Sequence, residues 1–166
     1  ALAMFFGDIR LERFIGEVRE GDYMSGPGKI SHIQLQSRHD WVQHYLLSAG
    51  LTLAGGRGIA DFIGEAKEVD DASNKASGFS FTDLAADRAG VRFAEIATGS
   101  VEGARRIQSV LSRPVGEPDF FPEIRDLPEG LTAAQFAARY GERDSAAFKR
   151  VIADIDRRIS RIPMYR

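Results

Sequence analysis

The chain has 166 residues, of which 43% are hydrophobic and 28% charged, and its formal net charge at pH 7 is -2. This composition is typical of a soluble globular protein with enough apolar residues to form a core. Basic residues form no stripe with aromatic residues between them, which argues against nucleic-acid binding. The sequence contains no cysteine, so disulfides, thiolate metal sites and cysteine nucleophiles are excluded.

The apolar stretches are too short and too interrupted to span a membrane. The longest, Trp41 to Ala54, contains Gln43, His44 and Ser48, whereas a transmembrane helix needs about 20 apolar residues. We therefore expect no transmembrane segment. The opening residues, ALAMFF, lack the basic region and apolar stretch of an intact signal peptide. A targeting signal upstream of Ala1 stays open as an alternative.

Hydrophobic periodicity predicts helices along most of the chain. The expected helices cover residues 7–21, 38–54, 59–72, 82–98, 99–113, 132–141 and 145–162. The helix over 99–113 is expected to place Val101, Ile107 and Leu111 on one side, with Ala104 and Val110. The last helix carries an apolar stripe that ends at Pro163; its members are Phe148, Val151, Ile152, Ile155, Ile159 and Ile162.

Capping residues predict several helix ends. Ser37 is the expected N-cap of the helix over 38–54, and Ser80 or Thr82 caps the helix through about residue 98. Thr132 and Gln135 have the spacing of a capping box, in which each side chain satisfies a backbone donor of the other. Asp144 or Ser145 precedes the last helix.

Residues 114–131 contain four prolines and predict an irregular arm, anchored by Phe120 and Phe121. The sequence shows no internal repeat and no convincing strand pair. We therefore predict an all-α fold, a compact bundle of about five to six helices with this proline-rich arm. Its parts would be a helical core domain (1–113), the connecting arm (114–131) and a C-terminal helical pair (132–166) that packs on the core.

Three consecutive predicted helices carry polar pairs within otherwise apolar surroundings. The pairs are spaced i, i+3 or i, i+4, so each lies on one helix face. A bundle interior lined by carboxylates and a histidine is how helical proteins bind metals. Oxygen donors with one imidazole would suit Mg, Mn, Zn or Fe. The candidate metal ligands are His44, Glu68, Asp71, Asp83 and Asp87.

A metal at these ligands could activate water for hydrolysis of a phosphate or acyl substrate. In that hypothesis Glu68 acts as the general base and His44 as a ligand, and these two are the candidate catalytic residues. The candidate binding residues are Lys67, Arg88 and Ser80, of which Lys67 or Arg88 would bind an anionic group.

The same charges also fit a structural network. Arg38, Lys67 and Arg88 lie beside the acids and could neutralise them, and buried charges persist only when they are paired and hydrogen-bonded. Ser48 lies one turn past His44 on the same helix. That arrangement does not give the crossed geometry of a catalytic triad, so we expect Ser48 to pack between helices.

Three segments carry a resemblance to a known family: HYLLSAGLTLAGG (44–56), GEAKEVDDA (64–72) and SGFSFTDLAADRAG (77–90). The pattern resembles the YfiM-like lipoproteins of bacteria and, more distantly, the VanZ-like proteins. It covers about a third of the chain, from Asp40 to about Phe93. The chain differs by adding Glu65 and Asp70 and by its C-terminal arm. The matching residues are His44, Lys67, Glu68, Asp71, Gly78, Phe79, Ser80, Phe81, Asp83, Asp87 and Gly90.

The resemblance implies an envelope-associated helical protein with no established activity. From the charged network we expect a non-enzymatic module that packs on a protein partner through the C-terminal arm. Phe120, Phe121 and the terminal RIPMYR are the expected contact elements. The alternative is a metal-dependent hydrolase or metal-binding protein, and whether the chain is an enzyme stays open. The expected location is the periplasm or envelope, with the cytoplasm as the alternative.

Overall fold

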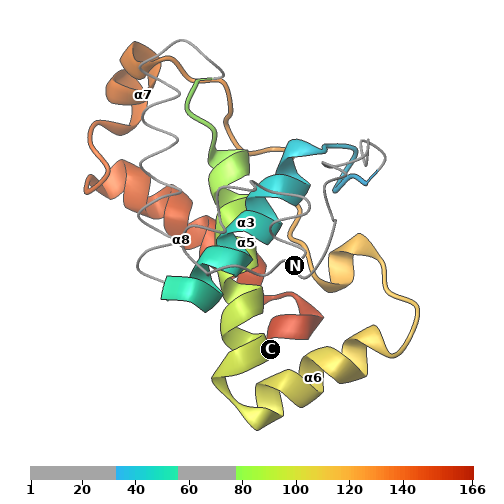
Figure 1. Cartoon of the computed structure of the whole chain (residues 1–166). Coiled ribbons are helices and arrows are strands. Elements are labelled where there is room, and N and C mark those ends of the chain that lie inside the picture. The colour runs from blue at the N-terminus through green and yellow to red at the C-terminus, as the bar shows by residue number, and fades with distance from the viewer. Residues whose placement is uncertain (1–32, 56–77) are drawn as a thin grey trace, which may run out of the picture.

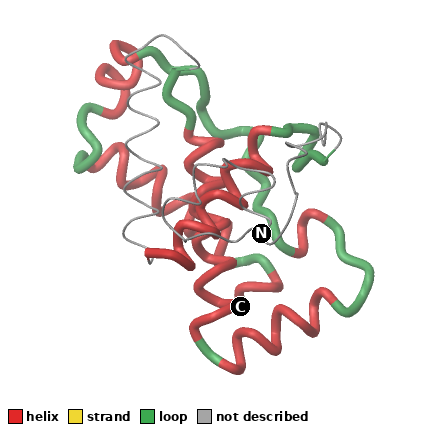
Figure 2. The backbone as a smooth tube through the Cα atoms, in the orientation of Figure 1, coloured by secondary structure: helices red, strands yellow, loops and turns green. Residues whose placement is uncertain are grey.

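A computed structural model describes residues 33–55 and 78–166 of the chain. The described part contains α-helices and short 3-10 turns, and its only β pairings are two isolated bridges (Figure 2). The predicted all-α fold is therefore confirmed, whereas the helices expected over 7–21 and 59–72 lie outside the described residues. The elements are α3 (Asp40–Gly55), α5 (Phe81–Gly99), α6 (Val101–Leu111), η2 (Glu117–Asp119), α7 (Ala133–Tyr140), α8 (Ala146–Ser160) and η3 (Pro163–Tyr165).

Helices α3 and α5 pack against each other at the centre of the described fold (Figure 1). Their backbones come into direct contact at Gly90, where an added Cβ would lie 2.0 Å from the carbonyl oxygen of Tyr45. No side chain larger than hydrogen fits at this crossing, so Gly90 sets the separation of the two helices. None of the described helices is long and apolar enough to cross a membrane.

Most helix ends follow the predicted caps. The Ser80 side chain accepts a hydrogen bond from the backbone N–H of Asp83 and caps α5, and Ser145 caps α8 in the same way. Thr132 and Gln135 form the expected capping box of α7, which ends at Gly141. These are local hydrogen bonds between residues three apart, which explains why the sequence pattern predicts them.

The cap predicted at Ser37 is wrong. Gln36 and Ser37 have φ angles of 46° and 68° and form a left-handed turn, which Leu35 and Arg38 close with two backbone hydrogen bonds of 2.9 Å each. Ser37 is therefore a central residue of the turn and does not cap the helix, and α3 begins at Asp40. Both central residues of such a turn have positive φ, which is uncommon for residues other than glycine.

Aromatic side chains join α5 to the C-terminal helices. The ring centroids of Phe79 and Phe136 lie 4.4 Å apart, and those of Phe81 and Tyr140 lie 4.9 Å apart. Phe148 of α8 completes this cluster at 5.7 Å from Phe81. The rings meet edge-on or tilted, as aromatic pairs in cores prefer.

The proline-rich arm buries some of its apolar side chains in the core and leaves the rest of its length at the surface. Phe121 and Ile124 are 1% and 0% exposed, and one hydrophobic cluster includes described residues of all three predicted segments. The C-terminal residues Met164 and Tyr165 are also buried. Phe121, Met164 and Tyr165 are therefore not available at the surface as contacts for a partner.

The apolar side predicted for α6 is only partly buried. Ile107 is 5% exposed, but Val101 and Leu111 are 60% and 49% exposed. Only part of α6 packs on the rest of the described fold, because the helix lies at its edge (Figure 1). Val101 and Leu111 therefore lie on the part of that side which the described fold leaves exposed.

Candidate functional site

The α3–α5 contact contains a polar cluster built on Asp87. His44 and Ser48 lie one turn apart on α3, and both contact the same oxygen of Asp87 on α5. His44 Nδ1 lies 3.1 Å from Asp87 Oδ1, and Ser48 Oγ donates a hydrogen bond to that oxygen at 2.7 Å. The three residues are buried, with exposures of 9% for His44, 2% for Ser48 and 5% for Asp87.

A second carboxylate faces the other side of the imidazole. Asp83 lies one turn before Asp87 on α5, and its Oδ2 is 3.6 Å from His44 Nε2. This separation is longer than a hydrogen bond. The His44 ring therefore lies between two carboxylates, in hydrogen-bond contact with one of them. We call His44, Ser48, Asp83 and Asp87 the α3–α5 cluster.

The α3–α5 cluster contains two carboxylates inside the protein, where an ionised group loses the stabilisation that water provides. Asp83 and Asp87 are buried, and Asp87 Oδ2 has no hydrogen-bond partner among the residues that the structure describes. A buried carboxylate is stable only when neighbouring groups compensate the loss of water. Within the cluster, an imidazole supplies at most one positive charge.

Asp40 and Arg38 lie outside this cluster. Arg38 Nε donates to Asp40 Oδ1 at 2.9 Å, and Arg38 Nη1 lies 3.1 Å from Glu129 Oε2 in the arm. The hydrogen bond from Arg38 lowers the pKa of Asp40 below its usual value. Asp40 is therefore part of a surface ion-pair network with Arg38 and Glu129, which links α3 to the arm.

Arg88 and Ser80 have contacts of their own. Arg88 makes a two-pronged ion pair with Asp156 of α8, with two N–O distances of 2.8 Å. Ser80 caps α5 and hydrogen-bonds Thr82 Oγ1 at 2.8 Å. These contacts account for both residues as parts of the fold, joining α5 to α8 and fixing the start of α5.

The remaining predicted site residues, Glu68, Asp71 and Lys67, lie outside the described residues. The predicted meeting of three helices is therefore described for α3 and α5 alone. In the ranges 33–55 and 78–166, no group of three or more histidine, aspartate or glutamate side chains is arranged to bind a metal.

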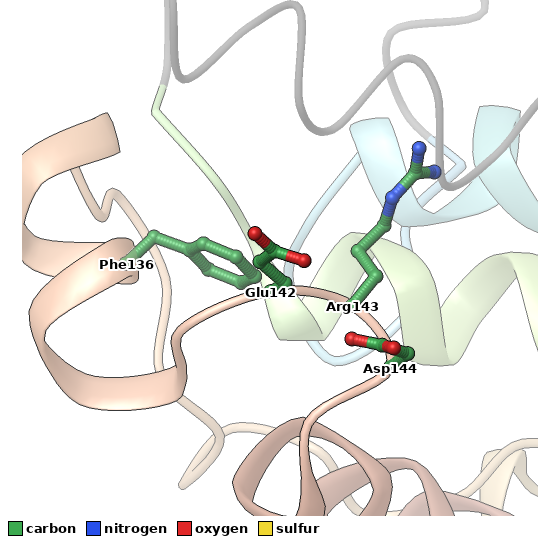
Figure 3. Close-up of a pocket in the computed structure, with 4 residues that line it drawn as sticks. All are labelled: Phe136, Glu142, Arg143 and Asp144. Carbon is green, nitrogen blue, oxygen red and sulfur yellow. The ribbon is translucent and has the colours of Figure 1, made fainter.

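Two surface hollows lie away from the cluster. One, of about 420 Å³, is lined by Phe136 of α7 and by Glu142, Arg143 and Asp144 of the loop before α8 (Figure 3). In Figure 3 the Glu142 carboxylate lies beside the Phe136 ring, while Arg143 extends away from it. The other hollow, of about 230 Å³, is lined by Arg88, Arg92, Asp156, Ile159 and Ser160.

Three residues that fix the surroundings of the cluster carry no local signal in the sequence. Asp156 pairs with Arg88, Glu129 pairs with Arg38, and Tyr165 hydrogen-bonds both Tyr45 at 2.9 Å and the Phe120 carbonyl at 2.7 Å. Each contact joins residues more than 40 positions apart. No spacing pattern in a single sequence identifies such partners.

No family model, curated protein or solved structure matches the chain. The resemblance to the YfiM-like and VanZ-like proteins therefore stays a prediction, which depends on the three segments quoted above.

Proposed function

We propose that the chain is a non-enzymatic helical module that packs on a protein partner and whose α3–α5 cluster fixes the register of its central helices. One observation carries the register role: Asp87 Oδ1 accepts hydrogen bonds from His44 and Ser48, which lie one turn apart on α3. A shift of α3 along α5 would break both bonds and leave a buried carboxylate unpaired. Buried polar groups are known to specify register in this way.

The contacts of Ser48 support a non-enzymatic role. A serine nucleophile needs its hydroxyl beside the nitrogen of a histidine that accepts its proton. Here the hydroxyl donates to Asp87 at 2.7 Å, so the carboxylate and not His44 accepts its hydrogen bond. Ser48 therefore fits a packing residue, as its place on the helix predicts.

The exposed side of α6 is the surface that we propose for the protein partner. Because Phe121, Met164 and Tyr165 are buried, a partner would contact other apolar side chains, and exposed ones are Val101 and Leu111 of α6 and Val115 at the start of the arm. Arg105 and Arg106 are exposed on the same helix. This mixture of apolar and basic side chains suits a protein surface that carries acidic residues.

The register role is tested with the metal-free protein in EDTA. We expect Asp87→Ala and Ser48→Ala to lower the urea midpoint, while generic phosphate and acyl esters are not turned over by the wild type. Unchanged stability in both variants would contradict the register role. Turnover that His44→Gln abolishes would overturn the non-enzymatic assignment in favour of a hydrolase.

The partner is tested with a photo-crosslinking amino acid at Leu111 or, as the control, at Lys149 on the exposed side of α8. We expect a discrete cross-linked species from position 111 that Arg105→Glu weakens. The same species from both positions would contradict a specific role for α6. A bacterial envelope location is part of this proposal on the resemblance alone, and fractionation of a tagged chain tests it against the cytoplasm.

A further inference from the structure

The smaller of the two surface hollows lies where α8 packs on α5 (Figure 1). Two of its described lining residues, Arg88 and Arg92, lie one turn apart on α5, and the other three come from the second half of α8: Asp156, Ile159 and Ser160. The described lining therefore contains two guanidinium groups and one carboxylate. Its excess of positive charge attracts anions.

The two arginines differ in what their guanidinium groups contact. Arg88 donates from Nε and Nη2 to the two carboxylate oxygens of Asp156, each at 2.8 Å. Among the described residues, the Arg92 guanidinium contacts one acid, Glu95, from Nη1 at 3.5 Å. This distance is longer than an ordinary N–H to O hydrogen bond. In the described part of the chain, the Nε–Nη2 edge of Arg92 thus has no acidic partner like that of Arg88.

An oxyanion suits this edge of Arg92. The Nε–Nη2 edge of an arginine binds carboxylate and phosphate groups through two parallel hydrogen bonds. We propose that the hollow between α5 and α8 binds a phosphate group through the Nε–Nη2 edge of Arg92. This inference goes beyond the proposed function, because it uses neither the α3–α5 cluster nor the exposed side of α6.

The size of the hollow favours a small anion. Its volume is about 230 Å³, whereas a molecule of liquid water takes up about 30 Å³ and pockets for drug-sized ligands have about 300–1,000 Å³. A phosphate group therefore fits, and a large cofactor does not. Ile159, which is 4% exposed, gives the hollow an apolar wall. Electrostatic attraction is stronger beside such a wall than in open water.

The charges of the lining favour phosphate over a carboxylate. A phosphate group carries a charge of about −1.5 to −2 at pH 7, so it gains more than a carboxylate does from the two arginines. The negative charge of Asp156 is compensated by its ion pair with Arg88. Ser160 Oγ donates to the Arg157 carbonyl at 2.9 Å. This oxygen still accepts a hydrogen bond, which the P–OH of inorganic phosphate supplies and a carboxylate does not.

The test is calorimetric titration of the purified full chain with inorganic phosphate at pH 7 and constant ionic strength. We expect one phosphate per wild-type chain, weaker binding of acetate, and at least tenfold weaker binding of phosphate to Arg92→Gln. Arg92→Lys keeps the charge and loses the two-pronged geometry, so it should also bind more weakly than the wild type. Methyl phosphate distinguishes the source: tighter binding than inorganic phosphate indicates a phosphate ester as the ligand, and weaker binding indicates the free ion.

Arg157→Gln is the matched control. Like Arg92, Arg157 contacts an acid three residues away, with Nη1 at 3.4 Å from Asp154 Oδ1, but it does not line the hollow. The variant should bind phosphate as the wild type does.

A second measurement in the wild type keeps the test valid where a variant loses stability. NMR of the arginine Nε–H groups should show that phosphate shifts the resonance of Arg92 and leaves that of Arg157 in place. Absence of phosphate binding, or equal binding by the wild type and Arg92→Gln, would overturn the inference. The register role and the partner are measured without phosphate, so their failure and the failure of the phosphate site are distinguishable.

Discussion

Removal of the Asp87 carboxylate is the most direct perturbation of the α3–α5 cluster. Asp87→Ala deletes the acceptor of two hydrogen bonds, from His44 Nδ1 and Ser48 Oγ, and leaves both donors inside the protein. Hydrogen bonds to charged groups contribute about 1.5–3 kcal/mol each. Loss of one member of a buried pair typically costs about 3–5 kcal/mol, and we expect a decrease of that size in the free energy of unfolding.

A double-mutant cycle isolates the bond between Ser48 and Asp87. Ser48→Ala and Asp87→Ala should be non-additive, with a coupling free energy of about 1.5–3 kcal/mol, because the bond joins a hydroxyl to a buried carboxylate at 2.7 Å. Asp87→Asn keeps the acceptor oxygen and removes the charge, so it separates the charge from the hydrogen bonds. Glu142→Gln, in the exposed loop before α8, is the control and should change stability by less than about 0.5 kcal/mol.

The assay is urea unfolding at pH 7 in EDTA, followed by circular dichroism. A domain of this kind has a total stability of about 5–15 kcal/mol, so the expected decrease is easily measured. A cost below about 1 kcal/mol for Asp87→Ala, with an unchanged dependence on urea and no coupling to Ser48, would refute the reasoning. The carboxylate would then be too hydrated to act as a register device.

Three further predictions concern the surroundings of the cluster. Gly90→Ala should destabilise by about 1–3 kcal/mol, since its Cβ would overlap the Tyr45 carbonyl; Gly99→Ala, with no atom within 4 Å, is the control and should show no such loss in the same urea assay. Burial raises the pKa of Tyr45 and of Tyr165, so both stay protonated in the folded chain. Their contribution is complete below pH 10.0, where tyrosine ionises in the unfolded chain, and is lost as the pH rises further. We expect the urea midpoint to fall above that pH, less steeply in Tyr165→Phe; an equal slope in the variant would contradict the assignment. Arg38 lowers the pKa of Asp40, so the stability from ionised Asp40 is complete above pH 3.8 and is lost as the pH falls. Unfolding measured as the pH falls below 3.8 should therefore depend less on pH in Asp40→Asn, and a wild-type profile in that variant would refute the pairing.

Local signals in the sequence were sufficient for the all-α fold and for most helix ends. The caps at Ser80, Thr132 and Ser145 involve residues three positions apart, so each is encoded where it acts. Ser37 is the exception. Its cap was predicted from residue type, but the left-handed turn around it is closed by Leu35 and Arg38 and is tied to the arm through Gln36, which hydrogen-bonds the Pro122 carbonyl at 2.8 Å.

For the candidate site too, helical spacing predicted the local arrangement of residues but not their distant partners. Helical spacing correctly placed Asp83 and Asp87 on one face of α5 and His44 one turn from Ser48 on α3. It did not reveal the distant partners, Glu129 of the arm for Arg38 and Asp156 of the last helix for Arg88.

The sequence by itself determined which charged residues are present and which of them share a helix face, because residues one helical turn apart can be recognised from their spacing. Which charges meet depends on how α3 crosses α5, and the contact of Gly90 with the Tyr45 carbonyl sets that crossing. Cross-chain contacts of this kind form only when the whole core packs. The tertiary structure therefore decided that the His44 ring would lie between Asp83 and Asp87.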